Sequence, residues 1–531
     1  MDVGAAQFEE KLPRLQELLL GCDFVGLDME FTGLHSVFSP EGEPSLFDSP
    51  SEWYRKARWS VQQFTVSQLG LSIFCNERSN KYVAHSYNFF LFPMTFGQKD
   101  SEFSFQATSV QFLSHYGFDY NKFLKDGIPY MNKTQEEKFQ HLLPGSWMIR
   151  SGFGKDKLKQ VIDEVTRWIS LAEEEDSMVL QDLYGFQLFE IQLILRQAIQ
   201  DIWTVPLGGQ EVMVIKLNPQ QRWLLQNTSY DSCRREQILL SARGFTNLFQ
   251  TLVEARKPLV GHNMLMDLLH LHEKFYKSLP ESYEMFKKNI HTLFPVLLDT
   301  KNITKAFWKE FQFPQASTLL EIDEVLCSSS LSGTAQSCPE IFHASDCLRY
   351  ATQKSPHEAA YDAFLCGSVL LKIAHLLLSR SSCDPARSTP TFSQYLDVLA
   401  TYVNQVNLIR ASVQNINFSG TDDCTRRPPC LIAYVHGWPG VNEEQIHREL
   451  KTLCRFDVRR LRTNQFLLLS NKFKDVKMVL REYKGHPNIQ ISLYHYWRHS
   501  PQVNCFLQVC GIVASWALMA LLLGGSSSCA I

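Results

Sequence analysis

The sequence predicts an α/β protein that contains more than one domain and ends in a long apolar helix. Strand-like apolar runs and amphipathic helical patterns both recur along the chain, which is typical of sheets covered by helices. The 531 residues exceed what one hydrophobic core organises, so we expect about two to four domains. With 45% hydrophobic and 20% charged residues, the composition is that of an ordinary globular protein.

Charge and cysteine usage narrow the class of protein further. The formal net charge is −3, so a nucleic-acid partner would have to be held by a local site and not by a general basic field. The 14 cysteines include no C-x-x-C pair, which fits reduced thiols in a cytosol-facing protein. The first residues carry no signal-peptide pattern, and we therefore expect the bulk of the chain to stay in the cytosol.

The first domain is expected to open with an amphipathic helix over residues 6–20, which leads into a strand at 24–31. Strand-like runs at 61–74 and 82–92 would form a meander beside it, after a polar, proline-containing loop. Residues 112–130 are dense in aromatic side chains. The pattern fits a packed helix and turn as well as a surface that faces nucleotides, and both interpretations stay open.

A small domain is predicted to interrupt the first one at residues 151–230. Helical patterns at 158–171 and 185–203 precede a strand-like run at 211–217. A helix over 234–256 then leads back into the first domain.

The first domain would accordingly comprise residues 1–150 and 231–400. Its second part is expected to begin with a strand at 259–263 and a helix at 264–276.

Residues 427–497 show the βαββαβ order of ferredoxin-like modules, the arrangement that RNA-recognition modules use. The run Phe466-Leu467-Leu468-Leu469 is mainly aliphatic where such modules carry stacking aromatics. We therefore predict a degenerate RNA-recognition-like module that serves packing or partner contact. Its strands are expected at 431–436, 457–461, 466–469 and 489–493, and its helices at 443–453 and 473–483.

The C-terminal segment 503–523 is predicted to be a transmembrane tail anchor. Residues 505–523 contain no charged side chain, and a helix of this length spans roughly 28 Å, close to the thickness of a bilayer core. Tyr494, Tyr496 and Trp497 precede it in the place of an aromatic belt. The alternative is a buried terminal helix of a soluble domain. The lack of basic residues after the segment favours the endoplasmic reticulum membrane over the mitochondrial outer membrane.

The strand at 24–31 carries two acids, Asp28 and Glu30, separated by one residue. Side chains alternate along a strand, so both carboxylates would point from the same face. Two neighbouring carboxylates in a partly dry site repel one another unless a cation lies between them. Oxygen ligands of this kind suit Mg²⁺ or Mn²⁺, whereas the plain alternative is a strand end with two solvated acids.

Two further acids occur in apolar helices downstream. Asp267 follows Gly261-His262-Asn263 at the start of a helix, and Asp362 enters a second helix five residues after His357. Taken singly, Asp267 fits an acid on a solvent-facing helix surface, and His357 fits a capping or surface histidine. Three matched contexts in one order make a joint site the stronger hypothesis.

These motifs resemble the DEDD exonuclease superfamily in its histidine-bearing form. More closely, the sequence resembles the poly(A)-specific ribonuclease family of deadenylases over most of residues 1–375. The motifs that carry the resemblance are Asp28-Met29-Glu30-Phe31-Thr32-Gly33, Gly117-Phe118-Asp119-Tyr120-Asn121-Lys122, Gly127-Ile128-Pro129-Tyr130, Gly261-His262-Asn263-Met264-Leu265-Met266-Asp267, Leu297-Leu298-Asp299-Thr300-Lys301 and His357-Glu358-Ala359-Ala360-Tyr361-Asp362.

The resemblance implies a ribonuclease-H-like fold, a mixed sheet with helices on both faces and acids at the strand ends. It implies that Asp28, Glu30 and Asp362 hold one Mg²⁺, and that Asp28 and Asp267 hold a second, with Mn²⁺ as the alternative ion. His357 would be the general base that takes a proton from the attacking water. All five positions carry the competent residue type, which argues against a catalytically dead scaffold.

The resemblance also implies contacts to the 3′ end of single-stranded RNA. Phe31 and Leu34 would pack on terminal bases, and Lys301 would contact the RNA. The family's inserted domain is named for an Arg-x₃-His pair, but Arg196 is followed here by Gln200 in the matching place. This departure predicts a degenerate RNA-binding insert.

The C-terminal anchor points to the PARN-like domain-containing branch of that family, which trims the 3′ ends of piRNAs at the mitochondrial surface. We therefore predict a Mg²⁺-dependent 3′-to-5′ exoribonuclease that releases 5′-nucleotides from poly(A) tails or piRNA precursors. The resemblance suggests a Tudor-domain adaptor, a Piwi protein and a second copy of the chain as partners. The alternative function is an RNA-binding scaffold that tethers RNA to a membrane.

Overall fold

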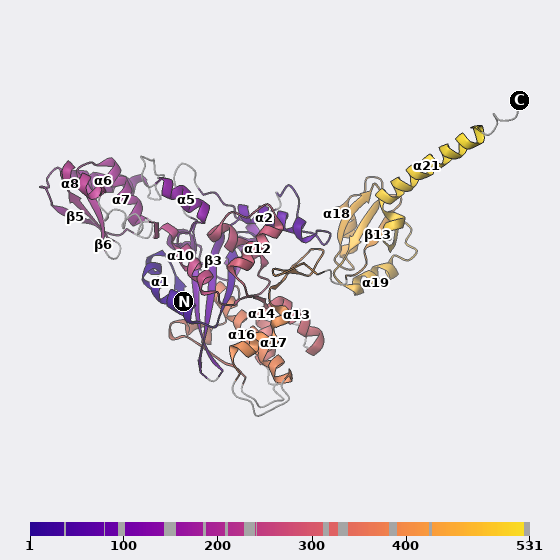
Figure 1. Ribbon diagram of the computed structural model, residues 1–531, viewed down its shortest axis with the longest axis horizontal. Helices are drawn as coiled ribbons and strands as arrows, with labels where there is room; N and C mark the ends of the chain where they lie inside the picture. The colour runs from indigo at the N-terminus through magenta and orange to yellow at the C-terminus, as the bar shows by residue number, and fades with distance from the viewer. Residues whose placement is uncertain are drawn as a thin grey trace. The chain divides into compact units, whose positions relative to one another are not determined.

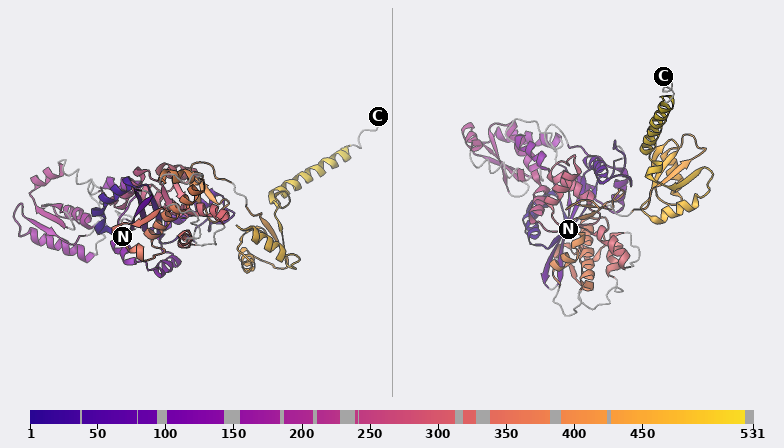
Figure 2. Two further views of the ribbon diagram at one scale, coloured as in Figure 1. Left: turned by 90° about the horizontal axis from the view of Figure 1, so that it is seen from below. Right: turned by 45° about the vertical axis from the view of Figure 1, so that its right-hand side comes forward.

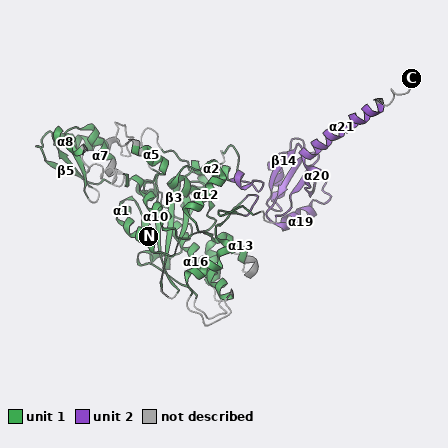
Figure 3. Cartoon of the chain, in the orientation of Figure 1, with its two compact units in different colours: residues 1–43, 54–409, 415–423 green, residues 44–53, 410–414, 424–531 purple. Residues whose placement is uncertain are grey.

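The computed structural model describes residues 1–36, 39–78, 80–93, 101–142, 155–183, 187–207, 211–227, 239–240, 242–311, 318–327, 338–381, 390–423 and 427–524. The chain divides into two compact units, shown in Figure 3. Unit 1 comprises residues 1–43, 54–409 and 415–423, and unit 2 comprises residues 44–53, 410–414 and 424–531.

Unit 1 is organised around a seven-stranded mixed sheet (Figure 1). Strand β2 pairs antiparallel with β3, which pairs antiparallel with β4, so the predicted meander is present. On its other side β2 pairs parallel with β8. The chain begins beside this sheet in each view of Figure 2, because β1 pairs with β4. The sheet order is β1 (Asp2–Val3), β4 (Lys81–Phe90), β3 (Val66–Arg78), β2 (Phe24–Phe31), β8 (Leu259–Gly261) and β9 (Leu297–Asp299), with β10 (Glu340–His343) beside β4.

Helices cover both faces of this sheet, as the resemblance implied. On one face, Phe89 of β4 contacts Phe8 of α1 (Ala5–Gly21) and Phe245 of α10 (Phe245–Ala255). The neighbouring Asn88 points to the opposite face, where it contacts the first turn of α16 (Ala359–Ser381). The alternation of side chains along β4 therefore separates the two helical layers.

Helix α16 lies directly on β2 and β3. A Cβ atom at Gly26 would overlap the carbonyl group of Ala363, and one at Gly70 would overlap the backbone of Ala359. The absence of side chains at these two positions lets the first turns of the helix approach the centre of the sheet. The helix is apolar and long enough to cross a membrane, but 61% of its most apolar window is buried inside the protein, which identifies it as a core helix.

Two predicted boundaries in unit 1 are wrong. Residues 61–63 belong to α2 (Pro50–Gln63) and not to a strand, because Tyr54, Ala57 and Val61 recur at helical spacing and are buried on one side. The predicted helix at 264–276 is α11 (Leu265–Leu271), followed by one turn of π-helix at His272–Tyr276. Part of the predicted helix at 234–256 lies outside the described residues.

The other described elements of unit 1 surround the sheet. They are α3 (Ala107–His115), α4 (Tyr120–Asp126), α5 (Lys133–Leu142), α12 (Tyr283–Leu293), α13 (Thr300–Phe311), α14 (Leu319–Cys327), η3 (Ser345–Cys347), α15 (Arg349–Thr352), α17 (Phe392–Val398), η4 (Ala400–Tyr402), β11 (Gln405–Asn407) and β12 (Asn415–Asn417).

The inserted segment has a hydrophobic core of its own, which includes Val165, Ile191 and Val214. Trp203 lies in a strand and not in the predicted helix, because Ile202–Leu207 pairs along its whole length with the next strand. The sheet order is β5-β7-β6. The elements are α6 (Lys155–Ile169), β5 (Ser177–Leu180), α7 (Gln187–Ala198), β6 (Ile202–Leu207), β7 (Glu211–Lys216) and α8 (Pro219–Asn227).

Unit 2 contains a four-stranded antiparallel sheet with the order β14-β15-β13-β16. Two helices pack on one face, and Phe466 is fully buried there among aliphatic side chains. Phe466 is therefore not a stacking residue on the open face. The elements follow in the βαββαβ order as β13 (Leu431–Val435), α18 (Glu443–Lys451), β14 (Asp457–Arg462), β15 (Gln465–Leu469), α19 (Phe473–Glu482) and β16 (Ile489–Leu493).

The other face of this sheet contacts residues 45–48, which we call the docking segment. Asp457 accepts hydrogen bonds from the Ser45 hydroxyl at 3.1 Å and the Leu46 amide at 2.7 Å. Two residues along β14, the Arg459 guanidinium lies 4.7 Å from the centre of the Phe47 ring. The docking segment belongs to unit 2 by its contacts, although it follows β2 in the chain.

Unit 2 ends in α20 (Tyr496–His499) and the 24-residue helix α21 (Pro501–Gly524). Helix α21 is long and apolar enough to cross a membrane, with a mean hydropathy of 2.1 in its most apolar window. No part of that window, among the residues described, is buried inside the protein. Trp497, just before the helix, is 80% exposed.

Candidate active site

The acids Asp28 and Glu30 lie near the end of β2, on the face that α16 covers. Phe24 and Gly26 of the same strand contact α16 or its neighbours, and every second residue points the same way. In the pairing with β3, Asp28 stands opposite Gly70 and Glu30 opposite Gln68. The structure therefore has the two carboxylates on one face, as the spacing predicts.

Helix α16 brings Asp362 to this pair, because its first turn rests on Gly26 and Gly70. Single ligand atoms of Glu30, His357 and Asp362 all lie within 4.8 Å of one another. Glu30 lies more than 300 positions before His357 and Asp362 in the sequence, and the packing of one helix on one strand brings it beside them.

Asp267 is brought to the same region by the strand on the other side of β2. It lies in the first turn of α11, which follows β8, and β8 runs parallel to β2. Its side chain is buried, with 7% of the residue exposed, and its Oδ1 atom has no hydrogen-bond partner among the described residues. A buried carboxylate oxygen without a donor costs free energy unless a ligand completes it. The predicted alternative, an acid on a solvent-facing surface, is wrong.

The four carboxyl groups share one poorly solvated environment. Burial raises the pKa of Asp28 well above its usual range, and the nearby Asp362, Asp267 and Glu30 raise it further. Burial and the charges of Asp362 and Asp267 do the same for the pKa of Glu30. Burial raises the pKa of Asp267 to about 7 and that of Asp362 to about 7.

The donor set fits divalent cations. Among the described residues, no lysine or arginine forms an ion pair with any of the four carboxylates, and the group within ion-pair distance of Asp362 is the His357 ring at 4.0 Å. Clustered carboxylate oxygens without counter-charges are the ligands that Mg²⁺ and Mn²⁺ take in proteins. The unpartnered Oδ1 atom of Asp267 supports the same conclusion.

His357 stands between the acids and a pair of aromatic rings. Its backbone has a φ of +62°, the left-handed region that costs a non-glycine residue about 1–2 kcal/mol. Its amide donates to Asp362 Oδ2 at 3.1 Å, which ties the turn to the acid cluster. Burial lowers the pKa of the imidazole, so the ring is neutral at neutral pH and can accept a proton.

The aromatic-rich segment divides into two roles. Phe123 of α4 is fully buried and packs on Phe92 and Phe103, as a packed helix and turn would. By contrast Phe112 of α3 and Tyr116, which directly follows that helix, are each 43% exposed, and their rings lie 4.7 Å and 4.2 Å from the His357 ring. An exposed aromatic surface therefore borders the candidate site.

The residues predicted to contact RNA differ in their exposure. Phe31 is buried and stacks on His270 with ring centres 4.2 Å apart. Leu34 is 44% exposed, and its amide donates to the Gln106 side chain. Lys301 is partly buried at the start of α13, and its amide donates to Asp299 at 2.9 Å.

Asp299 is a structural residue that the sequence did not single out. Its carboxylate is fully buried and accepts backbone amides of Asn263 at 2.8 Å, Met264 at 3.3 Å and Asn407 at 2.9 Å, besides that of Lys301. It thereby holds the turn that leads from β8 to the Asp267 helix. The available signal was an acid directly after the strand residues Leu297 and Leu298.

The central strand of a mixed sheet carries two of these carboxylates, and two neighbouring helices bring two more and a histidine beside them, which is the arrangement expected of a nuclease. Residues 3–370 match the model of the CAF1 family ribonucleases, and the chain belongs to this family. The family match confirms the sequence-based prediction of an enzyme that degrades RNA.

Named relatives share far more than the nuclease segment. The chain is 63% identical to the Mus musculus protein named poly(A)-specific ribonuclease PNLDC1, over 99% of each chain. It is 27% identical to the Bombyx mori protein named pre-piRNA 3′-exonuclease trimmer, over 94% of each chain. A solved structure of S. pombe Pop2p in its Mg²⁺- and Mn²⁺-bound form is 14% identical, covers 74% of this chain and 98% of its own, and has a TM-score of 0.35.

Proposed function

We propose that the protein is a divalent-metal-dependent 3′-to-5′ exoribonuclease that removes 5′-nucleotides one at a time from RNA 3′ ends. The observation that carries this proposal is the cluster of four carboxylates beside His357, which have no lysine or arginine partner among the described residues. The family and the names of the two relatives support the same reaction class.

The chain's residues have distinct roles in the reaction. Asp28, Glu30, Asp267 and Asp362 would hold two Mg²⁺ or Mn²⁺ ions, which would supply stabilisation of the negative charge that develops on the phosphodiester oxygens. The neutral imidazole of His357 takes a proton from the water that attacks phosphorus. The bond from phosphorus to the 3′-oxygen of the preceding nucleotide breaks, and that oxygen leaves with the shortened RNA.

The RNA end is held by stacking and by charge. Phe112 and Tyr116 offer exposed aromatic surface beside His357, and Leu34 offers exposed apolar surface beside Gln106. Stacking on an aromatic ring contributes roughly 1–3 kcal/mol per base without selecting its identity. Lys301 supplies a positive charge close to the turn that leads to Asp267. Phe31, although buried on His270, borders the two acids of β2 and supports the floor of the site.

Digestion of a labelled single-stranded RNA with a free 3′-OH tests the reaction. We expect Mg²⁺-dependent shortening from the 3′ end by the wild-type protein, and no shortening by Glu30→Ala. Glu340→Gln, which removes an exposed carboxylate 3.1 Å from Lys81, is the matched control and should cleave at the wild-type rate. RNA binding that survives chelation, with unaltered RNA ends in every sample, would contradict the enzyme and support the alternative of a membrane-tethered RNA scaffold.

We propose precursors of piRNAs as the substrate, with poly(A) tails as the competing class. The name of the Bombyx mori relative supports the first and that of the Mus musculus relative supports the second. Competition between a poly(A) RNA and a mixed-sequence RNA of equal length distinguishes the two substrate classes. A poly(A)-specific enzyme degrades the poly(A) RNA faster, whereas an enzyme that trims piRNA precursors does not favour it. A Piwi protein or a Tudor-domain adaptor that presents the RNA, and a homodimer, belong to the same proposal.

Helix α21 is proposed to anchor the enzyme in a membrane with the nuclease in the cytosol. Its exposed apolar surface and the exposed Tyr496 and Trp497 before it support this proposal. Deletion of residues 503–531 should move the protein from the membrane pellet to the supernatant, and unchanged pelleting would contradict the anchor. Fractionation then separates the endoplasmic reticulum from the mitochondrial outer membrane.

A further inference from the structure

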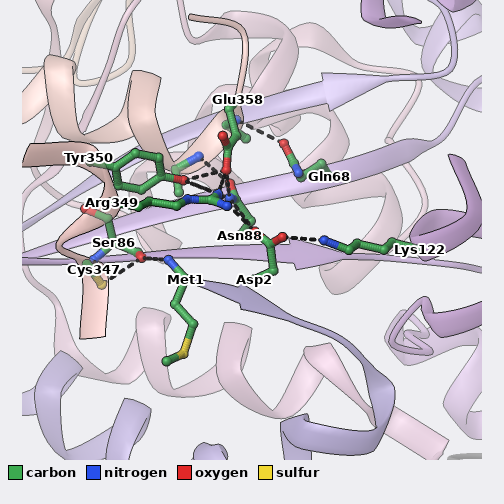
Figure 4. A network of polar contacts seen from close by, with 12 residues as sticks. Met1, Asp2, Gln68, Ser86, Asn88, Lys122, Cys347, Arg349, Tyr350 and Glu358 are labelled. Atoms are coloured by element: carbon green, nitrogen blue, oxygen red, sulfur yellow. Dashed lines mark hydrogen bonds and ion pairs between the residues drawn. The ribbon is translucent and has the colours of Figure 1, made fainter. Parts of the chain in front are cut away.

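Glu358, the residue after His357, is held by a network of polar groups (Figure 4). Its carboxylate accepts a hydrogen bond from the Tyr350 hydroxyl at 2.6 Å, and it also contacts the Asn88 amide and the Arg349 guanidinium. These three groups come from β4 and from α15. The side chain thus points away from the metal ligands and into the sheet.

Two side chains of the sheet hold the backbone that follows Glu358. The amide of Ala359 donates to Gln68 Oε1 at 3.0 Å, and the amide of Ala360 donates to Asn88 Oδ1 at 2.7 Å. These amides are in the first turn of α16 and have no partner within the helix. Asn88 is fully buried, and its side chain contacts both the helix backbone and the Glu358 side chain.

An outer layer of charges holds the network in place. Asp2 accepts hydrogen bonds from Asn88 at 3.0 Å, from Lys122 at 2.7 Å and from Arg349 at 3.1 Å (Figure 4). The negative Asp2 and Glu358 are thereby matched by the positive Lys122 and Arg349. None of these residues is among the proposed metal ligands, so the network has a role separate from ion binding.

We propose that Glu358, through Asn88, is a positioning residue that maintains the left-handed turn at His357 and so directs the imidazole toward the attacking water. This inference rests on the proposed role of His357 as the general base. The turn at His357 is strained, and it is fixed on one side by Asp362 and on the other by the network around Glu358. Loss of the Glu358 carboxylate leaves the turn free to relax, and the ring then leaves its position.

The first test is a double-mutant cycle on single-stranded RNA digestion at saturating Mg²⁺. Glu358→Ala should lower kcat about 10- to 100-fold, the range that supporting residues around a metal site show, and should change KM less than about twofold. In the His357→Ala background, Glu358→Ala should cause no further loss of kcat, because the ring it positions is absent. Glu358→Gln, which can still accept from Tyr350, should recover part of the activity.

A second readout does not depend on activity. In the metal-free protein, hydrogen exchange of the Ala359 and Ala360 amides should be faster in Glu358→Ala than in the wild type, since the turn that precedes them is released. Glu340→Gln is the control and should change neither kcat nor exchange, because Glu340 is on β10 beside Lys81, the first residue of β4. If Glu358→Ala does not fold, Arg349→Met removes only the half-exposed cation and should lower kcat by a smaller factor, roughly two- to tenfold.

Each failure points to a different error. Unchanged kcat in Glu358→Ala, or an equal additional loss in the His357→Ala background, would overturn the positioning role and leave the nuclease proposal intact. Wild-type kcat in His357→Ala would overturn the proposed general base, and the positioning role with it.

Discussion

The seven-stranded sheet of unit 1 and the four-stranded sheet of unit 2 hold charged side chains in opposite environments. On β2 of unit 1, Asp28 and Glu30 lie beside two further acids, and no described lysine or arginine pairs with them. On β14 of unit 2, Asp457 accepts two hydrogen bonds from the docking segment and pairs with Arg410 at 3.2 Å. Arg459 on the same face lies 3.7 Å from Asp48.

This difference separates a ligand site from a structural surface. A carboxylate whose donors come from its own chain is complete in the folded protein and contributes to stability. Carboxylates that only repel one another destabilise the fold until an external cation binds, and folds retain such an arrangement where it serves a function. By this criterion the acid cluster of unit 1 has the properties of an ion site, which supports the proposed function, and the outer face of the sheet in unit 2 holds a segment of its own chain.

The largest expected effect comes from removing one charge of the acid cluster. Asp28→Asn keeps the volume of the side chain but loses a charged carboxylate that would hold the divalent ions of the proposed site, so kcat for RNA digestion should fall on the order of 10³-fold. The thermal midpoint of the metal-free variant at pH 8 should not fall, because the substitution also removes repulsion. A lower thermal midpoint together with normal kcat would show that Asp28 stabilises the fold and is not an ion ligand.

A smaller effect is expected on stability as a function of pH without divalent ions. The pKa values of Asp267 and Asp362 are raised to about 7, so the folded protein binds their protons more tightly than the unfolded chain does. Stability from these groups is therefore complete near pH 4 and decreases as the pH rises toward 7 and above. Mg²⁺ at about 100 times its dissociation constant should restore about 2.7 kcal/mol at pH 8.

Thermal denaturation at pH 5 and pH 8, with Mg²⁺ or with a chelator, measures this effect. The gain from Mg²⁺ should be larger at pH 8, because protons compete with the ion at pH 5. In Asp267→Asn the metal-free protein should lose less stability between the two pH values than the wild type. Equal gains at both pH values would show that the carboxylates do not titrate in the folded protein.

The sequence predicted those features of the two sheets that depend on local periodicity. The spacing of Asp28 and Glu30 on a strand, with an acid and a histidine at the start of later helices, was enough to name the acid cluster. The βαββαβ order of unit 2 was also visible, since each element has its own hydrophobic pattern. Residues 61–63 were misassigned because Val61 is followed at short distance by the apolar residues of a strand, so the end of the helix reads as the start of that strand.

The features that the sequence did not predict depend on contacts between residues that are distant along the chain. Asp457 meets Ser45 across 412 positions, and Glu358 meets Asn88 across 270. A buried Asn within a strand, or an acid next to a histidine, carries no local signal of its partner. Tertiary packing decides which charges are paired. The difference between the unpaired acids of the unit 1 sheet and the paired acid of the unit 2 sheet could therefore be seen only in the structure.

The smallest effect is expected where charges are paired. Asp457→Ala removes the acceptor of the Leu46 amide and the Ser45 hydroxyl, and should lower the stability of unit 2 by about 1–3 kcal/mol in denaturant unfolding. Arg448→Ala is the control, because its exposed ion pair with Glu444 at 3.9 Å contributes only about 0.3–0.5 kcal/mol. Mg²⁺ binding and kcat should stay within about twofold of the wild type, since Asp457 is no ion ligand. If Asp457→Ala instead strengthens RNA binding, the docking segment covers a surface that can itself bind RNA. The two sheets would then differ in which surface is open to RNA and not in how their charges are paired.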